Sequence, residues 1–291
     1  MRVEFHRKEI GRGGLAGNKA VRFYRGLIFL LAVLWLQAMT PAQTAQPSRA
    51  TSQKSTGEND PARQEEARRW ISRSIAAYGG ENRLLAITDV SFSSHSTGPS
   101  GAPIQFKVYF KGGDKFRSEV TGSGEGAGIK FFAMTIANGP SAWLKTDESV
   151  IDLVAGDVES LKVSTLIQSQ PYALFDRLTK FWALGDRTVD GVTYQMVGVS
   201  GFLANHYTRG EISLDPQSFL IRRFEYEEEV ETKEGKGVRK NDLRYEGYQP
   251  FEGIMLPTRV VSQTGEAKSS TTFSDFKINS GVPDGYFDKP K

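Results

Sequence analysis

Apolar and polar residues alternate with a period of two over much of the chain. In the stretch PIQFKVYFK, residues 103–111, every second position from Ile104 to Phe110 is apolar, and the positions between them are mostly polar or charged. This alternation is typical of a strand with one buried and one solvated face. Similar segments, bounded by Gly, Pro, Asn or Asp, recur before and after residues 157–184. The pattern predicts about ten antiparallel strands joined by hairpins.

Two regions follow a helical period instead. In residues 60–80, Asp60 can cap a helix, Pro61 suits its first position, and Gly79 with Gly80 can end it. Apolar residues up to Tyr78 recur there at helical spacing, which predicts an amphipathic helix. Residues 157–184 lose the two-residue period and predict two further helical pieces, broken before Pro171.

These elements together indicate an α+β domain. One N-terminal helix and one helical pair cannot cover a flat sheet of about ten strands, whereas a sheet that curls around them can bury its apolar face. The expected fold is therefore a strongly curved antiparallel sheet, an incomplete β-barrel, wrapped around the N-terminal helix and a central helical lid.

The first part of the chain predicts export. Residues 1–42 combine basic residues, an apolar run from Leu27 to Met39 and small residues after it. This is the pattern of a secretory signal peptide, cleaved near Ala42 or Ala45, and an uncleaved N-terminal membrane anchor is the alternative. Residues 43–60 hold no large apolar side chain and predict a flexible linker, which leaves residues 61–291 as the folded domain.

Charge and cysteine content narrow the class of protein. Residues 1–42 hold seven Lys/Arg and two Asp/Glu, whereas the whole chain has a net charge of +3, so the remainder is net −2. The domain therefore gives no sign of nucleic-acid binding. The chain has no Cys, which excludes a disulfide framework and a thiol nucleophile.

Catalytic and metal-binding motifs are missing from the sequence. His95 and His206 belong to no H-E-x-x-H pair, no G-x-S-x-G elbow occurs, and the acidic run EYEEEV lacks the spacing of a calcium-binding loop. We therefore expect a non-enzymatic protein that needs no metal or other cofactor.

Several segments occur in an order that is found in a known family. They are AAYGGENRLLAITDVSFSSHSTG, DGVTYQMVGVS, ISLDPQSFLIRRFEYE, YEGYQPFEGIMLPTRV and INSGVPDGYFDKP. Over about residues 63–290 the chain resembles the LolA-like periplasmic proteins, which include lipoprotein carriers and outer-membrane lipoprotein-sorting proteins. The resemblance implies a half-barrel with a helical lid and a hydrophobic cavity for acyl chains, in the periplasm of a diderm bacterium. It implies lipid or lipoprotein acyl chains as partners, with an envelope membrane protein as a second kind of partner.

The apolar face of the sheet supplies the candidate ligand-binding residues. If the helices do not fill a curved sheet, a lipid-sized cavity is left, and the alternative is that the same residues pack against the helices as core. The candidates are Phe106, Val108, Phe110, Phe116, Phe132, Met134, Trp143, Phe224 and Tyr245.

Other positions are candidates for the lid and for headgroup contact. Arg222 falls among aromatic residues, where an unpaired charge is costly, so it would latch the lid or meet an anionic headgroup. The alternative is a β-bulge that turns Arg222 outward. In the lid, the residues expected to face the sheet are Leu161, Leu166, Leu174 and Phe175.

The end of the chain predicts a structural role. Residues 279–285 are rich in turn formers, and the two rings that follow, Tyr286 and Phe287, are expected to return and seal the end of the sheet. Burying one such ring contributes roughly 1.5–3 kcal/mol, which is enough to hold a terminus in place.

The pattern and the resemblance together predict an exported protein that binds or carries a lipid or a lipidated ligand. Two other interpretations stay open. One is an envelope regulatory or interaction module that senses lipid or lipoprotein through the same fold, and the other is an envelope hydrolase.

The leader generates a prediction about processing. Fractionation of cells that make the full chain should place the protein beyond the inner membrane, with a mature N-terminus between about residues 40 and 50. N-terminal sequencing of the fractionated protein checks this. A full-length chain in the cytoplasm would contradict it.

Overall fold

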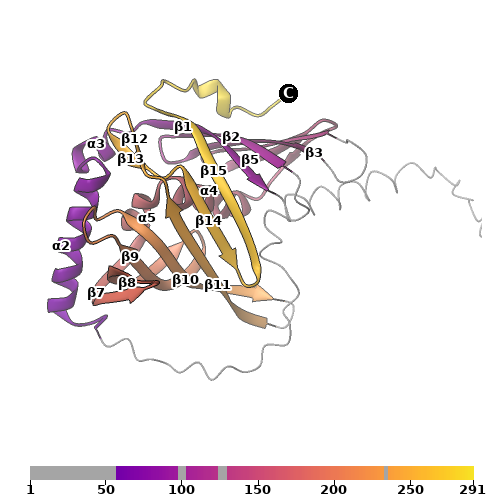
Figure 1. The fold of residues 1–291 in the computed structure, drawn as a ribbon. Helices are drawn as coiled ribbons and strands as arrows, with labels where there is room; N and C mark the ends of the chain where they lie inside the picture. The colour runs from indigo at the N-terminus through magenta and orange to yellow at the C-terminus, as the bar shows by residue number, and fades with distance from the viewer. Residues whose placement is uncertain (1–56, 98–102, 124–129, 233–234) are drawn as a thin grey trace, which may run out of the picture. The chain divides into compact units, whose positions relative to one another are not determined.

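A computed structural model describes residues 57–97, 103–123, 130–232 and 235–291 (Figure 1). The predicted signal peptide and the part of the predicted linker up to residue 56 lie outside the described residues. The helical elements are α2 (Pro61–Tyr78), α3 (Glu81–Leu85), α4 (Ala155–Ser169), the 3₁₀ turn η1 (Pro171–Ala173), α5 (Leu174–Arg177) and the 3₁₀ turn η2 (Asp284–Phe287).

Fifteen strands occur in the described part of the chain. They are β1 (Asp89–Thr97), β2 (Pro103–Lys111), β3 (Lys115–Ser123), β4 (Lys130–Asn138), β5 (Ser141–Thr146), β6 (Val150–Asp152), β7 (Leu178–Val189), β8 (Val192–Leu203), β9 (His206–Leu214), β10 (Ile221–Thr232), β11 (Gly235–Glu246), β12 (Gln249–Phe251), β13 (Ile254–Leu256), β14 (Arg259–Thr264) and β15 (Ala267–Ile278).

Thirteen of these strands form one antiparallel sheet in the order β6-β5-β4-β3-β2-β1-β15-β14-β11-β10-β9-β8-β7. Strands β12 and β13 form a separate small hairpin. The first strand pairs with the last, so that Val90 lies opposite Ile278 and Ser94 opposite Phe273. The α+β class and the antiparallel sheet are confirmed, but the sheet has more strands than the ten or so expected.

The extra strands have identifiable causes. Strand β6 has only three residues, which is too short to show a period. Strand β7 begins at Leu178, inside the region expected to be helical, because the second helical piece stops after the short α5. In β7, Phe181 and Ala183 face one side of the sheet and Trp182 the other, so large rings on both faces hide the alternation.

Helix α2 begins and ends where the sequence predicts. The Asp60 side chain accepts a hydrogen bond from the Ala62 amide at 2.9 Å, and Pro61 takes the first helical position. The helix stops at Gly79, whose φ of 131° suits glycine. Its buried residues are Ala67, Trp70, Ser74 and Tyr78, and it packs against β7, β13 and η1 (Figure 1).

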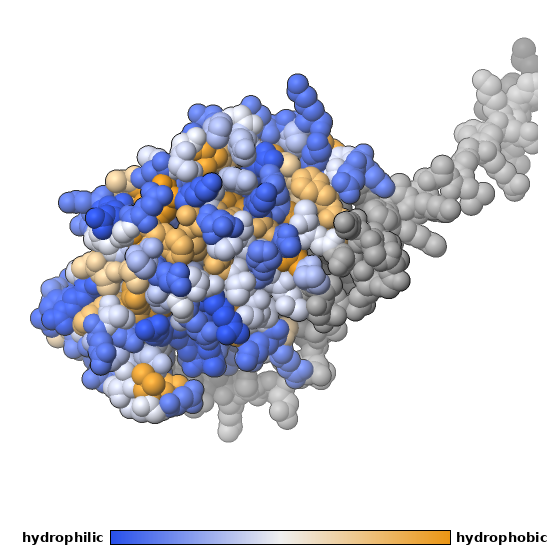
Figure 2. Space-filling model, turned by 45° about the horizontal axis from the view of Figure 1, so that its top comes forward, coloured by the Kyte–Doolittle hydropathy of each residue, from blue (hydrophilic) through white to orange (hydrophobic). Residues whose placement is uncertain are grey.

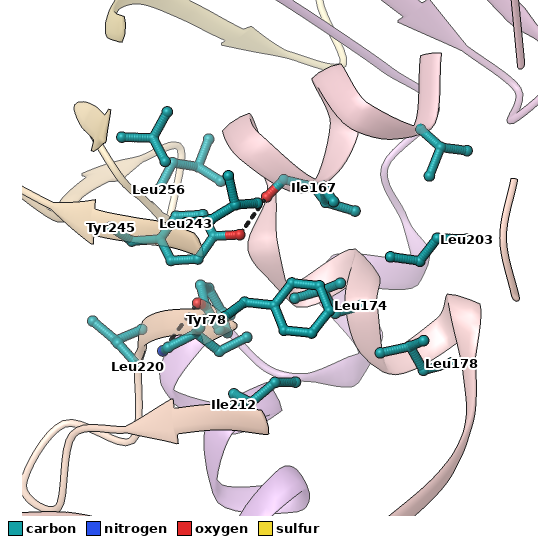
Figure 3. Close-up of a cluster of buried hydrophobic side chains, with 14 of the residues drawn as sticks. Tyr78, Ile167, Leu174, Leu178, Leu203, Ile212, Leu220, Leu243, Tyr245 and Leu256 are labelled. Atoms are coloured by element: carbon teal, nitrogen blue, oxygen red, sulfur yellow. Dashed lines mark hydrogen bonds between the residues drawn. The ribbon is translucent and has the colours of Figure 1, made fainter. Parts of the chain in front are cut away.

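The two faces of the sheet are covered by different parts of the chain. We call the side that bears Val108, Phe116 and Tyr245 the helix-covered face, because Val158, Val163 and Ile167 of α4 belong to the same core cluster. Directly paired residues share a face. Through the pairs that join Val260 to Tyr245 and Leu243 to Phe224, this face continues from β14 to β10. The central part of its core is shown in Figure 3.

The opposite side, which we call the outer face, is apolar only in part. On β4 and β5 it carries Met134, Ile136 and Trp143, which pack against the C-terminal residues Val282 and Phe287. On the strands from β7 to β14 it carries ion pairs, including Arg187–Glu211, Arg223–Asp242 and Arg259–Glu246. On the face shown in Figure 2, hydrophilic residues predominate and apolar ones lie among them in small groups.

The C-terminal segment is fixed to the outer face as a strap, residues 282–291. Phe287 is fully buried, whereas Tyr286 is 40 % exposed and lies under the guanidinium of Arg117. Basic side chains of the sheet bind the strap: Lys111 donates to the Val282 carbonyl at 2.7 Å, and Lys115 to the Asp284 carboxylate at 2.6 Å. The structural role of this ending is thus observed, but the strap covers a face of the sheet rather than its end, and only one of the two rings is buried.

The last residues of the predicted linker also contact the domain. The Glu58 carboxylate binds Arg209 at 2.9 Å and Lys180 at 3.3 Å, both on the outer face. Glu58 therefore ties the chain to β7 and β9 just before α2 begins.

The strap generates a prediction about stability. Replacing Phe287 by Ala should lower the free energy of unfolding by about 3–5 kcal/mol if the strap unfolds with the domain, because a fully buried ring is lost. If the strap detaches by itself, the loss appears as fast amide exchange in residues 282–291. Chemical denaturation together with hydrogen exchange measures both. The neighbouring change Tyr286→Ala, at an exposed ring, is the control, and equal effects of the two changes would contradict the account.

Candidate ligand-binding face

The helix-covered face carries a cluster of phenylalanine rings. The Phe92 ring lies 5.1 Å from Phe276, 5.6 Å from Phe273 and 6.4 Å from Phe110 between centroids, and Phe110 in turn lies 5.2 Å from Phe116. Such distances and tilted geometries are favourable for aromatic pairs. The cluster spans β15, β1, β2 and β3, and so it bridges the strands where the two ends of the chain meet.

The structure brings six of the nine predicted binding residues together on this face. Val108, Phe116, Phe224 and Tyr245 are fully buried in its core, and Phe106 and Phe110 are half-buried at its margin. The first four pack as core residues. The two half-buried rings are the members of the set that still expose surface on this side of the sheet.

The other three predicted residues, Phe132, Met134 and Trp143, lie on the outer face with the strap. The pairing fixes this, because Val120 of the helix-covered face lies opposite Ala133, which turns Phe132 and Met134 to the other side. The expectation of a single shared face was therefore wrong for them. Strand β4 is apolar on both sides, and the larger side chains belong to the side that the strap covers.

Helix α4 covers the apolar face partly with the expected residues, since Leu161 packs against the core cluster there. Its buried apolar residues are Val158, Val163 and Ile167, whereas Leu161 is half-buried and Leu166 lies outside the core cluster. Leu174 of α5 is fully buried, and Phe175 is half-buried with its ring 6.2 Å from Phe181. The lid segment thus lies on the predicted side, turned so that its β-branched residues face the sheet.

Two polar side chains fasten α4 to the sheet. Tyr245 of β11 donates a hydrogen bond to the carbonyl of Ile167 at 3.0 Å (Figure 3). The residue four positions after Ile167 is Pro171, which has no N–H to offer, so the helix leaves this carbonyl for Tyr245. Burial raises the pKa of the Tyr245 hydroxyl, which keeps it a donor.

The second fastening is Lys162, a buried lysine near the middle of α4. Its ammonium donates to the carbonyl of Gly113 in the β2–β3 turn at 3.1 Å and pairs with Glu159 at 2.5 Å. Arg177 of α5 also reaches Glu159, at 3.4 Å. A buried lysine needs such partners to keep its charge, so this contact sets the position of α4 relative to β2 and β3.

A bulge in β10 decides where Arg222 points. The register of β10 with β9 shifts between Ile221 and Arg223, so Arg222 is the extra residue. Its guanidinium pairs with Asp215 at 3.3 Å and lies 5.6 Å from the centre of the Tyr248 ring. The β-bulge considered for this position is thus observed.

Two tyrosines satisfy the backbone at this bulge. Tyr78 accepts a hydrogen bond from the Ile221 amide at 3.2 Å, and Tyr248 donates to the Ile221 carbonyl at 2.6 Å. The two hydroxyls lie 3.0 Å apart, so Tyr78 donates to Tyr248. Burial raises the pKa of both tyrosines, and both stay protonated. Helix α2 is thereby tied to β10 through a buried polar contact.

Sequence reasoning missed the polar residues that position the helices: Tyr78, Lys162, Tyr245 as a donor, and Tyr248. Their partners are backbone groups far away in the sequence, which a local pattern does not reveal. The one available signal is Pro171, which leaves a carbonyl free one turn earlier.

Neither a metal site nor a membrane-spanning helix is found within the described residues. No group of three or more His, Asp or Glu side chains there could hold a metal ion. The helices of the described part are also too short or too polar to cross a membrane.

No protein-family model and no curated protein sequence matches the chain. Solved structures do match. A LolA superfamily protein from Nitrosomonas europaea is 15 % identical with a TM-score of 0.46, and the match covers 77 % of this chain and 97 % of that one.

Two further solved structures match over a similar share of both chains. A protein domain from Vibrio parahaemolyticus, described as an outer membrane lipoprotein-sorting protein, is 12 % identical with a TM-score of 0.47 and coverage of 77 % and 97 %. A DUF1329 family protein from Desulfovibrio piger is 16 % identical with a TM-score of 0.46 and coverage of 76 % and 97 %. At these identities the similarity concerns the fold alone.

The fastening of α4 generates a prediction. Changing Tyr245 to Phe removes only the hydroxyl that binds the Ile167 carbonyl. The free energy of unfolding should fall by about 0.5–1.5 kcal/mol, and amide exchange in α4 should become faster. Chemical denaturation and hydrogen exchange check the two effects.

Tyr207→Phe is the matched control, because Tyr207 lies exposed on β9 beside Phe202. It should leave both quantities unchanged. Unaltered exchange of α4 in the Tyr245 variant would show that the hydrogen bond does not hold the helix.

Proposed function

We propose that this chain binds the acyl chains of a lipid or of a lipidated protein between the helix-covered face and α4. It would do so as an exported protein of the periplasm, without catalysing a reaction and without a cofactor. The signal-peptide pattern of residues 1–42 supports the location.

The proposal is supported by apolar side chains of the helix-covered face that remain partly exposed. Rings and aliphatic side chains there are only half-buried, although they pack against the core cluster; they are Phe106, Phe110, Leu161, Tyr172, Phe175 and Phe181. They come from the sheet, from α4 and from the segment after it. An acyl chain that lay between α4 and the rings of β2 would bury apolar surface on both sides.

The affinity of such a site comes from area. Each methylene taken out of water contributes about 0.8 kcal/mol, so a long acyl chain needs few directional contacts. Pockets for apolar ligands use a small number of polar groups for orientation, and the hydroxyl of Tyr172, which donates a hydrogen bond to the Gln170 side chain at 2.7 Å, is one such group.

Access to the face depends on α4. The helix contributes only a short line of β-branched residues to the core, and its polar fastenings are the bonds from Tyr245 and Lys162. A net hydrogen bond contributes about 1 kcal/mol, and one from a charged group about 1.5–3 kcal/mol. The burial of Val158, Val163 and Ile167 also holds the helix in place. The ligand would enter as α4 moves away from β2 and β3.

Mass spectrometry of an organic extract tests the proposal most simply. The protein is purified after native export, without detergent, and should release a lipid or an acylated peptide in stoichiometric amount. Capture of an envelope membrane protein together with an empty extract would favour the regulatory or interaction module instead.

Phe106 provides a test by mutation. Changing Phe106 to Ala should cost less than the roughly 3–5 kcal/mol typical of a fully buried ring, because Phe106 is only half-buried. Affinity for a fluorescent fatty-acyl probe should fall. Changing it to Trp should be tolerated for stability and should also reduce probe binding, since the larger ring occupies ligand space.

Phe132→Ala is the matched control, because Phe132 is also a half-buried ring of the same part of the sheet but lies on the outer face. It should leave probe affinity unchanged. If both Phe106 variants bind the probe as the unchanged protein does, the acyl site does not lie on the helix-covered face.

A further inference from the structure

The outer face of the sheet contains a hollow of about 460 Å³ over four adjacent strands, β11, β14, β15 and β1. Its lining includes Arg244, Arg259, Val261, Lys268 and Ser270. The volume is within the range of small-molecule sites, roughly 300–1,000 Å³. It is separated from the acyl site proposed above by the sheet itself.

The register of the strands explains the hollow. Val261 lies directly opposite Arg244 on one side and Ser270 on the other, so a valine and a serine stand next to each other in the middle of the face. Thr97 adds a third short side chain on β1. Long side chains surround this short floor: Arg244, Arg259 and Lys268. A depression results because the residues at its centre are small and those at its border are large.

The cationic side chains at the border are positioned by their neighbours. Arg259 donates to the Ser270 hydroxyl at 2.9 Å and to the Glu246 carboxylate at 3.0 Å. Arg244 donates through Nε to Asp242 at 3.1 Å, and Asp242 is itself held by Arg223. Each guanidinium keeps further N–H groups beyond those in these bonds.

Lys268 differs from the two arginines. Its ammonium makes no hydrogen bond or ion pair with any residue in the described part of the chain, and the side chain is exposed at the hollow. Three cations and one carboxylate, Glu246, thus line the hollow. The excess of positive charge favours an anionic ligand, and guanidinium groups match the oxygens of phosphate well.

The remaining groups favour hydroxyls on the same ligand. Thr97 and Ser270 can donate and accept hydrogen bonds, and the Glu246 carboxylate can accept them from an alcohol. An inorganic anion would leave these groups and most of the volume unused. We propose that the hollow binds a phosphate ester of a polyol, with the phosphate between Arg244, Arg259 and Lys268. The same chemistry occurs in a free sugar or glycerol phosphate and in the phosphoglycerol headgroup of a lipid.

Calorimetric titration of the full exported protein with glycerol phosphate at low ionic strength tests the site, because salt would screen exposed charges. We expect saturable binding that weakens about tenfold in Lys268→Gln and in Arg259→Gln, the effect of one lost charge-assisted contact. Lys240→Gln is the control. Lys240 is an exposed lysine of β11 that pairs with Glu227 and does not line the hollow.

Two further experiments show whether the phosphate ester belongs to a lipid or to a soluble molecule. In the first, the protein is sedimented with vesicles of phosphatidylcholine and phosphatidylglycerol. If it binds the vesicles, and Lys268→Gln and Arg259→Gln weaken that binding, the ligand is the headgroup of a lipid. Binding of glycerol phosphate without binding of vesicles assigns a soluble ester. Inorganic phosphate should bind more weakly than glycerol phosphate.

Three results would overturn the proposal. They are the absence of saturable binding to both glycerol phosphate and vesicles, binding that Lys268→Gln and Arg259→Gln leave unchanged, and equal affinity for inorganic phosphate and glycerol phosphate. Circular dichroism of the variants confirms that they fold. Because the acyl probe reports on the other face, its binding should not change in any of these variants, and the two proposals fail independently.

Discussion

The pairing of β1 with β15 is the contact on which the rest of the structure depends. It joins Asp89–Thr97 to Ala267–Ile278 and so connects strands β1–β6 with strands β7–β11, β14 and β15 in one sheet. The loop that it closes is nearly the whole domain, and such a long-range pairing has to be offset by many contacts that form with it. The phenylalanine cluster around Phe92 supplies part of them, since its rings come from both sides of this seam.

The two faces of the sheet differ in the side chains that they carry. In the order of the sheet, from β4 through β1 and β15 to β7, the helix-covered face is apolar. It is covered by α4, which lies in the chain between β6 and β7. On strands β7 to β14 the outer face carries ion pairs, and on β4 and β5 the strap buries Phe287 against it. A ligand that is apolar and one that is anionic would therefore find their sites on opposite sides of one sheet.

Much of this architecture could be predicted from the sequence, because it rests on local patterns. The alternation in residues 103–111 correctly places Val108 inside, and the cap at Asp60 and the glycines at its end correctly bound α2. The orientation of β4 could not be predicted, because Met134 and Ile136 on one side compete with Phe131 and the alanines on the other. It is fixed by the pairing with β3, and the strap then covers Met134 and Ile136. The tyrosine contacts to Ile167 and Ile221 also could not be predicted, since they depend on backbone groups left free by a proline and by a bulge.

Photo-crosslinking most directly locates the acyl chains that are proposed to lie between the helix-covered face and α4. A fatty acid that carries a diazirine near its methyl end is bound to the purified protein and activated by light, and the labelled peptides are identified by mass spectrometry. If acyl chains bind there, labels are expected on β2 around Phe106 and Phe110 and on the segment from Leu161 to Phe175. Labels confined to the outer face, on peptides that contain Phe132, Trp143 or the strap, would contradict it.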